Sequence, residues 1–365
     1  MMSSIKSAVS GFFPPPQFIS LPAVGVDVSD TSLKYIQFEK KGDALSLKAW
    51  GELKIPDGVV TQGVVNDAAA LGRIIGEVKK LTHTEFVRVS LPEERAYLFE
   101  TTVKHSLSPT EIYNALEFNL EQNVPLSPRD AEFDYTHVGS AEDAESHVVV
   151  TVYAKETVHA YQEACRIAEV IPLSFEVEAQ ALARAVVREG EGGVCLIVDF
   201  GKTRTGTGVV EKGVLMLTST VDLGGKDLDL SLHSAFPSAD EKELIRLKNE
   251  YGILTTDEEP RVREALLNPI TTLQNELLAR CGYWNTQVEE KSRAIERVIL
   301  CGGIANLAGL PEFLTEALGI ETVQAEVWLN AFTTDTVVPP ITKRYSYGYA
   351  TAIGLALGSF TTTGV

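Results

Sequence analysis

Two segments of the chain place an aspartate at the end of an apolar strand and follow it with small, hydroxyl-bearing residues. They are Asp27-Val28-Ser29-Asp30-Thr31-Ser32 and Asp199-Phe200-Gly201-Lys202-Thr203-Arg204-Thr205. A carboxylate at a strand end can hold hydrated Mg²⁺, because this ion prefers oxygen ligands and keeps several waters. The turn that follows can direct backbone N–H and hydroxyl groups at phosphate oxygens. Taken singly, each pattern is more often an ordinary turn.

A third segment joins an apolar strand to a pair of glycines. Val298-Ile299-Leu300 runs into Cys301-Gly302-Gly303-Ile304, and a helical pattern follows. Glycines at such a turn permit a ligand to approach the backbone closely. A tight turn without a ligand explains this segment equally well when it is considered alone.

The strands and helices that must position these segments form an alternating pattern, which predicts an α/β protein. Val24 to Val28, Leu33 to Glu39 and Leu45 to Leu53 are expected to be consecutive strands. Val194 to Phe200 opens a second copy of this strand–turn–strand arrangement. The weak duplication predicts two lobes of similar topology. Helices are expected at Asn66 to Leu81, Thr157 to Glu169, Ala179 to Arg188, Pro269 to Lys291 and Tyr347 to Gly358, and from a capping box at Ser238 to Glu241.

A segment of different character interrupts the first copy. Ser108-Pro109-Thr110-Glu111 is a capping box with proline at the first helical position, so a helix is expected to start there. Ile112, Leu116 and Leu120 give this helix one apolar stripe, and strands are expected at Asp130 to Gly139 and His147 to Tyr153. We therefore predict a small inserted α+β subdomain over residues 93–146.

Composition excludes several classes of protein. The chain has 365 residues and a formal net charge of −18 at pH 7, so sequence-independent nucleic-acid binding and direct binding to anionic lipid are not expected. No stretch is long and apolar enough for a membrane span, and no signal peptide is recognised. The cysteines lie far apart, which favours a reducing cytoplasm over a disulfide or zinc site; they are Cys165, Cys195, Cys281 and Cys301.

The order of the three segments resembles that of the actin, sugar kinase and heat-shock chaperone superfamily, whose members carry two phosphate loops, an adenosine motif and two connecting helices. Phe175 to Leu182 is similar to the first connecting helix, and Tyr347 to Leu357 to the second. Within the superfamily the chain most resembles the PilM family of actin-like, FtsA-related cytoplasmic proteins of type IV pilus assembly. The inserted segment, with its Asn123-Val124-Pro125-Leu126-Ser127-Pro128 exit, carries much of this resemblance.

The resemblance implies an RNase H-like, duplicated two-lobe fold with a PilM-type insertion. We expect a flexible leader, whose role stays open, followed by two actin-like lobes. The expected layout is residues 1–20 as leader, 21–92 and 147–190 as first lobe, 93–146 as insertion, 191–225 and 293–360 as second lobe, and 226–292 as helical subdomain.

The resemblance also implies a role for each matching residue with ATP or ADP and Mg²⁺ as ligands. Asp27 and Asp199 would organise Mg²⁺, largely through water, and Glu178 would orient the attacking water. Two sets of residues would surround the nucleotide. The phosphates would be lined by Ser29, Thr31, Ser32, Lys34, Gly201, Lys202, Thr203 and Thr205, and the nucleoside by Gly224, Gly225, Lys248, Gly302, Gly303 and Ile304.

Several departures from the family pattern favour nucleotide binding over brisk hydrolysis. Ser29 replaces the usual glycine, and Asp30 adds negative charge near the expected phosphates. Ile245 and Arg246 stand where relatives often place glutamate, and Ala179 follows Glu178 in place of the common proline. At most a slow Mg²⁺-dependent ATPase is expected.

Three functions are compatible with this fold. The PilM resemblance implies an assembly protein at the cytoplasmic face of the inner membrane, which docks the N-terminal tail of a PilN-type protein and joins other subunits of the pilus machinery. Self-association is a further expectation. A sugar kinase would need an acceptor-binding Asp/Asn/Glu cluster, which we do not identify. An FtsA-like filament protein typically ends in a basic amphipathic helix, and residues 359–365 do not form one.

Overall fold

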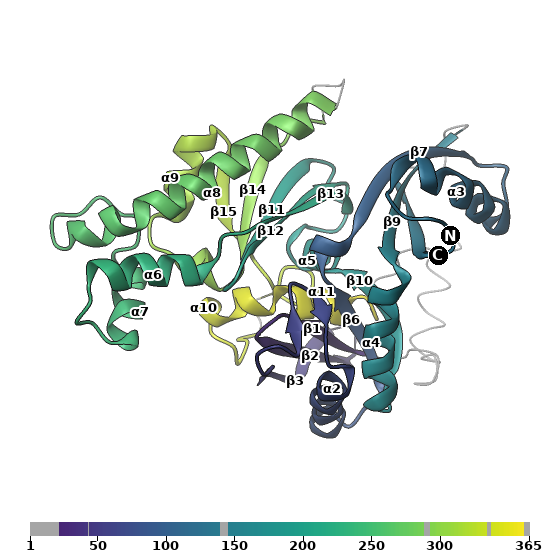
Figure 1. The fold of residues 1–365 in the computed structure, drawn as a ribbon, viewed down its shortest axis with the longest axis horizontal. Helices are drawn as coiled ribbons and strands as arrows, with labels where there is room; N and C mark the ends of the chain where they lie inside the picture. Colours follow the sequence, from purple (N-terminus) through teal and green to yellow (C-terminus); the bar gives the residue numbers. More distant parts are fainter. Residues whose placement is uncertain (1–21, 43, 139–144, 288–292, 334–336, 361–365) are drawn as a thin grey trace.

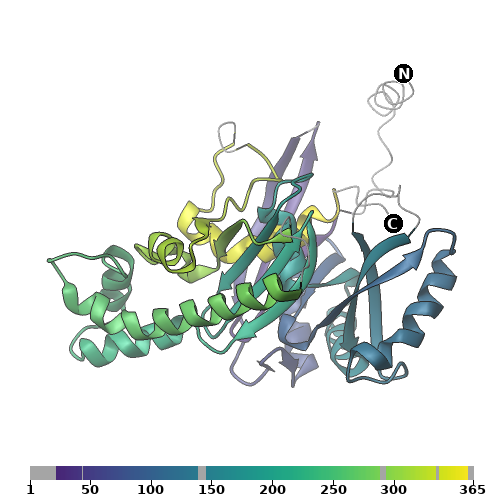
Figure 2. The ribbon, with the colours of Figure 1, turned by 90° about the horizontal axis from the view of Figure 1, so that it is seen from above.

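A computed structural model describes residues 22–42, 44–138, 145–287, 293–333 and 337–360. The predicted leader, residues 1–20, lies outside these ranges, as does most of the tail after Ser359. Two lobes lie side by side, with the inserted subdomain at one end of the molecule and the helical subdomain at the other (Figures 1 and 2). No helix within the described residues is long and apolar enough to cross a membrane.

Each lobe contains a five-stranded sheet with the same arrangement: an antiparallel meander followed by two parallel strands. This confirms the duplicated α/β fold. The first sheet has the order β10-β6-β1-β2-β3, with bounds Ile171–Val177, Phe86–Leu91, Val24–Val28, Ser32–Lys41 and Ala44–Lys54. The second has the order β13-β12-β11-β14-β15, with bounds Val214–Val221, Thr205–Glu211, Val194–Phe200, Arg297–Cys301 and Glu321–Gln324.

Strand register brings the chemical groups of each lobe to corresponding places. In the first sheet Asp27 pairs with Lys34 of β2, and Lys34 pairs in turn with Glu52 of β3. In the second sheet Asp199 lies between Gly206 of β12 and Cys301 of β14. β11 is buried along nearly its whole length, as its unbroken apolar sequence requires of a central strand.

Two short helices cross between the lobes at the centre of the molecule (Figure 1). They are α5 (Glu178–Val186) and α11 (Ala350–Leu357). A Cβ atom added to Gly354 would lie 1.6 Å from the carbonyl oxygen of Ala181, and one added to Gly25 would lie 2.1 Å from that of Ala352. Small residues thus let α11 approach both α5 and β1.

The remaining helices of the first lobe are α2 (Ala68–Thr82) and α4 (Lys155–Ile167), which pack together on one side of the sheet. Asp67 begins α2 by accepting a hydrogen bond from the Ala70 N–H at 2.8 Å. The short β4 (Val60–Thr61) and β5 (Val64–Val65) form a hairpin before α2.

The inserted subdomain has a core of its own. It consists of the turn η1 (Glu93–Arg95), β7 (Tyr97–Lys104), α3 (Pro109–Asn123), β8 (Ala131–Val138) and β9 (Glu145–Ala154). The capping box at Ser108 and Glu111 is present, and the predicted stripe on α3 is buried against the sheet. Strand β9 continues to Ala154, so the small sheet reaches into residues that the predicted layout gives to the first lobe; the boundary itself stays a prediction.

The second lobe carries three helices in its outer part and shows two differences from the sequence prediction. They are α6 (Gly225–Ala235), α7 (Glu241–Glu250) and α8 (Pro260–Gln287). Helix α7 is capped by Asp240, which accepts from the Glu243 N–H, so the capping box predicted at Ser238 is wrong. Helix α8 starts at Pro260 and runs through Pro269, because its apolar stripe begins already at Val262.

Smaller helices complete the second lobe. Four short helices of the described residues lie along the chain between β14 and α11. They are η3 (Gly303–Asn306), α9 (Leu310–Leu318), α10 (Lys343–Ser346) and η4 (Tyr347–Tyr349).

Candidate functional site

The turn after β1 is held rigid by its own serines. The Ser29 hydroxyl donates to the Ser32 carbonyl at 2.9 Å and accepts from the Ser32 N–H at 3.2 Å. Lys34 Nζ donates to the Ser32 hydroxyl at 3.1 Å and lies 3.7 Å from a Glu52 carboxylate oxygen. The backbone carbonyl of Thr31 accepts from Ile55. The side chain of Ser29 thus closes the turn.

The carboxylate of Asp27 lies at the end of β1 with little water around it. Loss of water raises its pKa, while Lys34 and the hydrogen bond from Ser90 act in the opposite direction. The Ser90 hydroxyl donates to Asp27 Oδ1 at 3.1 Å and accepts from the Val28 N–H at 3.0 Å. Ser90, at the end of β6, therefore fixes this carboxylate and was not identified from the sequence.

The turn after β11 is built on close backbone packing. Gly201 N donates to the Arg204 carbonyl at 3.0 Å, and Gly225 N donates to the Gly201 carbonyl at 3.0 Å. A Cβ on Gly224 would lie 2.5 Å from the carbonyl carbon of Thr203, so only glycine fits beneath the turn. Lys202 is exposed. Thr205 is fully buried and its hydroxyl donates to the Leu223 carbonyl at 2.7 Å, so it supports the turn from below.

Carboxylates from four elements converge between the two turns. Removal from water and mutual repulsion raise the pKa of Asp199 to about 6, with Asp27 as the repelling neighbour and Lys34 opposing the shift. The pKa of Glu178 is raised well above its usual value by burial first and then by Asp27. Burial also raises the pKa of Glu93 in η1 well above its usual value, and Asp199 is its strongest repelling neighbour. The region between the two turns therefore concentrates carboxylates whose mutual repulsion a divalent cation would relieve.

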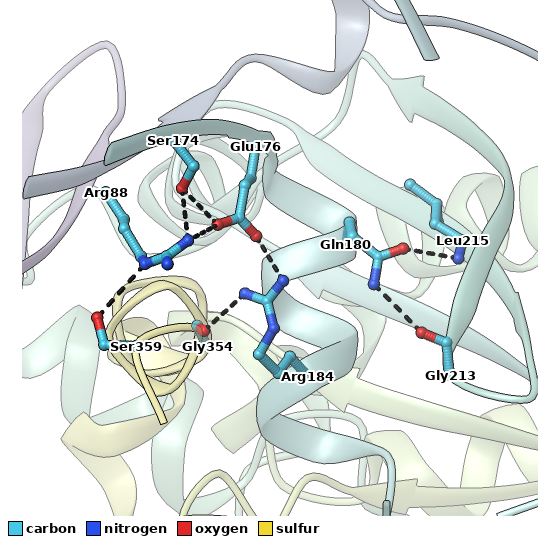
Figure 3. Close-up of polar contacts among 9 residues, drawn as sticks. All are labelled: Arg88, Ser174, Glu176, Gln180, Arg184, Gly213, Leu215, Gly354 and Ser359. Atoms are coloured by element: carbon cyan, nitrogen blue, oxygen red, sulfur yellow. Dashed lines mark hydrogen bonds and ion pairs between the residues drawn. The ribbon is translucent and has the colours of Figure 1, made fainter. Parts of the chain in front are cut away.

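The start of α5, which presents Glu178 to this cluster, is fixed by polar contacts on both sides (Figure 3). Two residues before it, Glu176 accepts from Arg184 at 2.6 Å and from Arg88 at 3.3 Å. Two residues after it, the Gln180 amide accepts from the Leu215 N–H at 2.8 Å and donates to the Gly213 carbonyl at 3.2 Å. Gln180 thereby ties α5 to the β12–β13 hairpin of the second lobe.

The glycine turn after β14 closes the same space from the second lobe. Gly302 has φ +81°, and a Cβ there would lie 2.4 Å from Asp199 Oδ1. A Cβ on Gly303 would meet open space. Ile304 lies against Gly225, 2.7 Å from where a Cβ of that glycine would be, so two of the predicted nucleoside segments are brought together.

Lys248 is nearly buried in α7, where its ammonium pairs with Asp229 of α6 at 2.5 Å. This pairing joins two helices of the helical subdomain. The predicted role of Lys248 beside the nucleoside stays a prediction.

An arginine to which the sequence prediction gave no role connects the turn after β11 with the turn after β1 and with η1. Arg204 pairs with Asp30 at 2.7 Å and with Glu94 of η1. Glu93 and Glu94 follow the end of β6, but no small hydroxyl-bearing residues come after them, so the pattern that singled out Asp27 and Asp199 did not find them. Their pairing with Arg204 depends on the tertiary fold.

The residues present fit a metal–nucleotide ligand. Asp27 and Asp199 come from equivalent positions in the two lobes, each followed by a tight turn, and the charge cluster between them calls for a cation. No group of three or more His, Cys, Asp or Glu side chains in the described part of the chain is arranged to hold a metal directly. A Mg²⁺ ion would therefore be held largely through water and phosphate oxygens.

A family model for the type IV pilus assembly protein PilM matches residues 25–360, which is almost the entire chain. The chain belongs to the PilM family. Membership confirms the family assignment made from the sequence. The protein is thus an actin-like type IV pilus assembly protein.

Solved structures show the same fold in other systems. A PilM–PilN type IV pilus biogenesis complex aligns at 23% identity with a TM-score of 0.75, covering 93% of this chain and 99% of the other. The ethanolamine utilization protein EutJ from Carboxydothermus hydrogenoformans aligns at 17% identity and TM-score 0.52, covering 94% and 90%. MreB5 of Spiroplasma citri bound to ADP aligns at 12% identity and TM-score 0.51, covering 84% and 92%.

Proposed function

We propose that this PilM family protein binds Mg²⁺-ATP or Mg²⁺-ADP in the cleft between its lobes. The observation that carries the proposal is the convergence of Asp27 and Asp199 from duplicated strand ends, with Glu178 and Glu93 beside them. Four neighbouring carboxylates that are removed from water destabilise one another when they are ionised, and Mg²⁺ bound with a nucleotide supplies the missing positive charge. A structural relative, MreB5, was solved bound to ADP, which supports a nucleotide as the ligand class.

The roles of the individual residues follow from their positions. Asp27 and Asp199 would hold the waters of Mg²⁺, and the turn N–H groups after each strand would contact phosphates, with Lys34 adding positive charge. Gly303 leaves open space, and Ile304 and Gly225 form an apolar contact where a nucleoside would pack. When bound, Mg²⁺ would polarise the phosphate oxygens.

We infer that hydrolysis is slow. A water-orienting base must be ionised, and burial together with Asp27 raises the pKa of Glu178 well above its usual value. Burial and the neighbouring carboxylates therefore disfavour the ionised form of Glu178 while no positive charge is present between the lobes. Nucleotide then acts chiefly as a structural signal between the lobes.

We further propose that the protein docks the N-terminal cytoplasmic tail of a PilN-type membrane protein in the groove between the first lobe and the inserted subdomain. The solved PilM–PilN complex, which covers 93% of this chain, supports this partner. The partner would place the protein at the cytoplasmic face of the inner membrane and beside other pilus subunits. Among the described residues we identify no site that would bind the acceptor of a sugar kinase, so the structure does not favour that function.

Two binding experiments test these proposals. Calorimetric titration with Mg²⁺-ATP should show binding to the wild type and marked weakening in Asp199→Ala; unchanged affinity in that variant would mean that the site is misassigned. A PilN-type tail peptide immobilised on beads should retain the wild-type protein. Failure to retain it, both with and without ATP, would argue against the docking role.

A further inference from the structure

Arg204 forms an ion-pair bridge across the cleft. Its guanidinium group lies 2.7 Å from Asp30 Oδ1 in the first lobe and also pairs with Glu94 Oε1 at the root of the inserted subdomain. The side chains of all three residues are less than one-fifth exposed. This partial burial reduces the solvent screening that makes surface ion pairs weak.

Both ends of this bridge belong to the turns that follow the two strand-end aspartates. Arg204 closes the turn after β11, where its carbonyl accepts from Gly201 and its backbone N lies against Gly224. Asp30 belongs to the turn after β1 and also accepts from the Gly63 N–H at 3.2 Å. The guanidinium group therefore lies between the two turns that are proposed to contact phosphates.

We propose that Arg204 determines the specificity for the nucleotide. When ATP binds, its guanidinium group leaves Asp30 and Glu94 and pairs with the terminal phosphate. The proposal rests on the nucleotide-binding function proposed above. A guanidinium fork matches the geometry of phosphate oxygens as well as that of carboxylates, and arginine stays charged throughout. Asp30 and Glu94 hold it in place while the cleft contains no triphosphate. ADP lacks the phosphate that would recruit it.

This assignment gives a reason for Asp30, whose negative charge near the phosphates otherwise opposes binding. Arg204 pairs with Asp30 and so offsets part of its negative charge, although the guanidinium group is shared with Glu94. Because Glu94 and the terminal phosphate compete for the guanidinium group, replacing Arg204 and replacing Glu94 should have opposite effects on ATP binding. Loss of Arg204 should weaken ATP binding, whereas loss of the charge on Glu94 should free the guanidinium group and strengthen it.

The test compares the dissociation constants of Mg²⁺ with a non-hydrolysable ATP analogue and of Mg²⁺-ADP, by calorimetry. In Arg204→Ala the preference for the triphosphate over ADP should fall about tenfold to a hundredfold. In Glu94→Gln, which preserves shape, triphosphate affinity should rise a few-fold while ADP affinity stays the same. Arg204→Lys keeps the charge without the fork and should give an intermediate preference.

Arg293→Ala is the matched control, because Arg293 of the second lobe also pairs with two carboxylates, Glu211 of the same lobe at 2.8 Å and Glu100 of the inserted subdomain at 3.4 Å, without touching either turn. It should leave the preference unchanged. An unchanged preference in Arg204→Ala and Glu94→Gln, with both nucleotides still bound, would overturn this proposal alone. Should Arg204→Ala not fold, Arg204→Lys and Glu94→Gln carry the same decision. If the wild type binds neither nucleotide, the proposed function is overturned and this proposal with it.

Discussion

Replacing Asp199 with asparagine should stabilise the free protein while abolishing its response to nucleotide. The pKa of Asp199 is raised from 3.8 to about 6 by loss of water and by Asp27, so ionisation of this group costs folding free energy. A rise of roughly two pKa units corresponds to about 3 kcal/mol at neutral pH, since each unit is about 1.36 kcal/mol. Asparagine has nearly the same shape and no charge.

The sign of the pH dependence follows from proton uptake. Between about pH 4 and pH 6 the folded wild type holds a proton on Asp199 that the unfolded chain has released, so stability falls as pH rises through this window. Asp199→Asn has no titrating group at this position, so its stability lacks this pH dependence. The difference in unfolding free energy between Asp199→Asn and wild type should therefore be small near pH 4, grow up to pH 6 and stay constant above it.

The assay is urea unfolding without Mg²⁺ at a series of pH values, repeated at pH 7.5 with Mg²⁺-ATP. At a nucleotide concentration a hundred times the dissociation constant, the wild type should gain about 2.7 kcal/mol and the variant almost nothing. Asp222→Asn, an exposed aspartate in the same lobe, is the control and should change neither quantity. The reasoning is refuted if Asp199→Asn is no more stable than wild type at pH 7.5, or if the difference does not depend on pH.

Three further predictions concern the helix crossing, the inserted core and Glu178. Gly354→Val should destabilise the protein by at least about 3 kcal/mol in urea unfolding, because the added atoms meet the Ala181 carbonyl, whereas Gly192→Val, which meets open space, should not. Leu116→Ala should cost about 2–5 kcal/mol locally and speed amide exchange in α3 and β7, with β1 and β11 unaffected; equal effects in the lobes would contradict a separate core. Glu178→Gln should retain Mg²⁺-ATP affinity and lose any measurable phosphate release, and an undiminished release rate would exclude Glu178 as the water-orienting residue.

Local signals in the sequence predicted the elements well where one pattern was unopposed. The capping box at Ser108 is followed by a clean apolar stripe, and α3 forms as expected. Near Asp240 two acceptable caps lie two residues apart, and only packing decides that Asp240 begins α7. Pro269 marks a helix start by local rules, yet the stripe from Val262 continues across it, because burial of that face outweighs the lost backbone hydrogen bond.

The candidate site was predictable as far as it depends on strand ends. Asp27 and Asp199 end duplicated strands, and their convergence follows from the topology. The partners of Arg204 were not predictable, since Asp30 is 174 residues away and Glu94 reaches the cleft only through the insertion. Thr205 shows the reverse case: its residue type fits a phosphate loop, but its register on β12 buries the hydroxyl.

The independent core of the inserted subdomain has a consequence for how such proteins diversify. The buried side chains of α3 and of the sheet face beneath it form a cluster of their own, whereas Val149 and Tyr153 of β9 belong to the cluster that joins the two lobes. Substitutions on α3, which lies away from η1 and its contacts with Arg204, therefore leave the packing around Asp27 and Asp199 undisturbed, because distant sites without shared partners contribute additively to stability. Selection can exchange one docking surface for another while the central machinery is conserved, and the unit can evolve with its partner as a replaceable module.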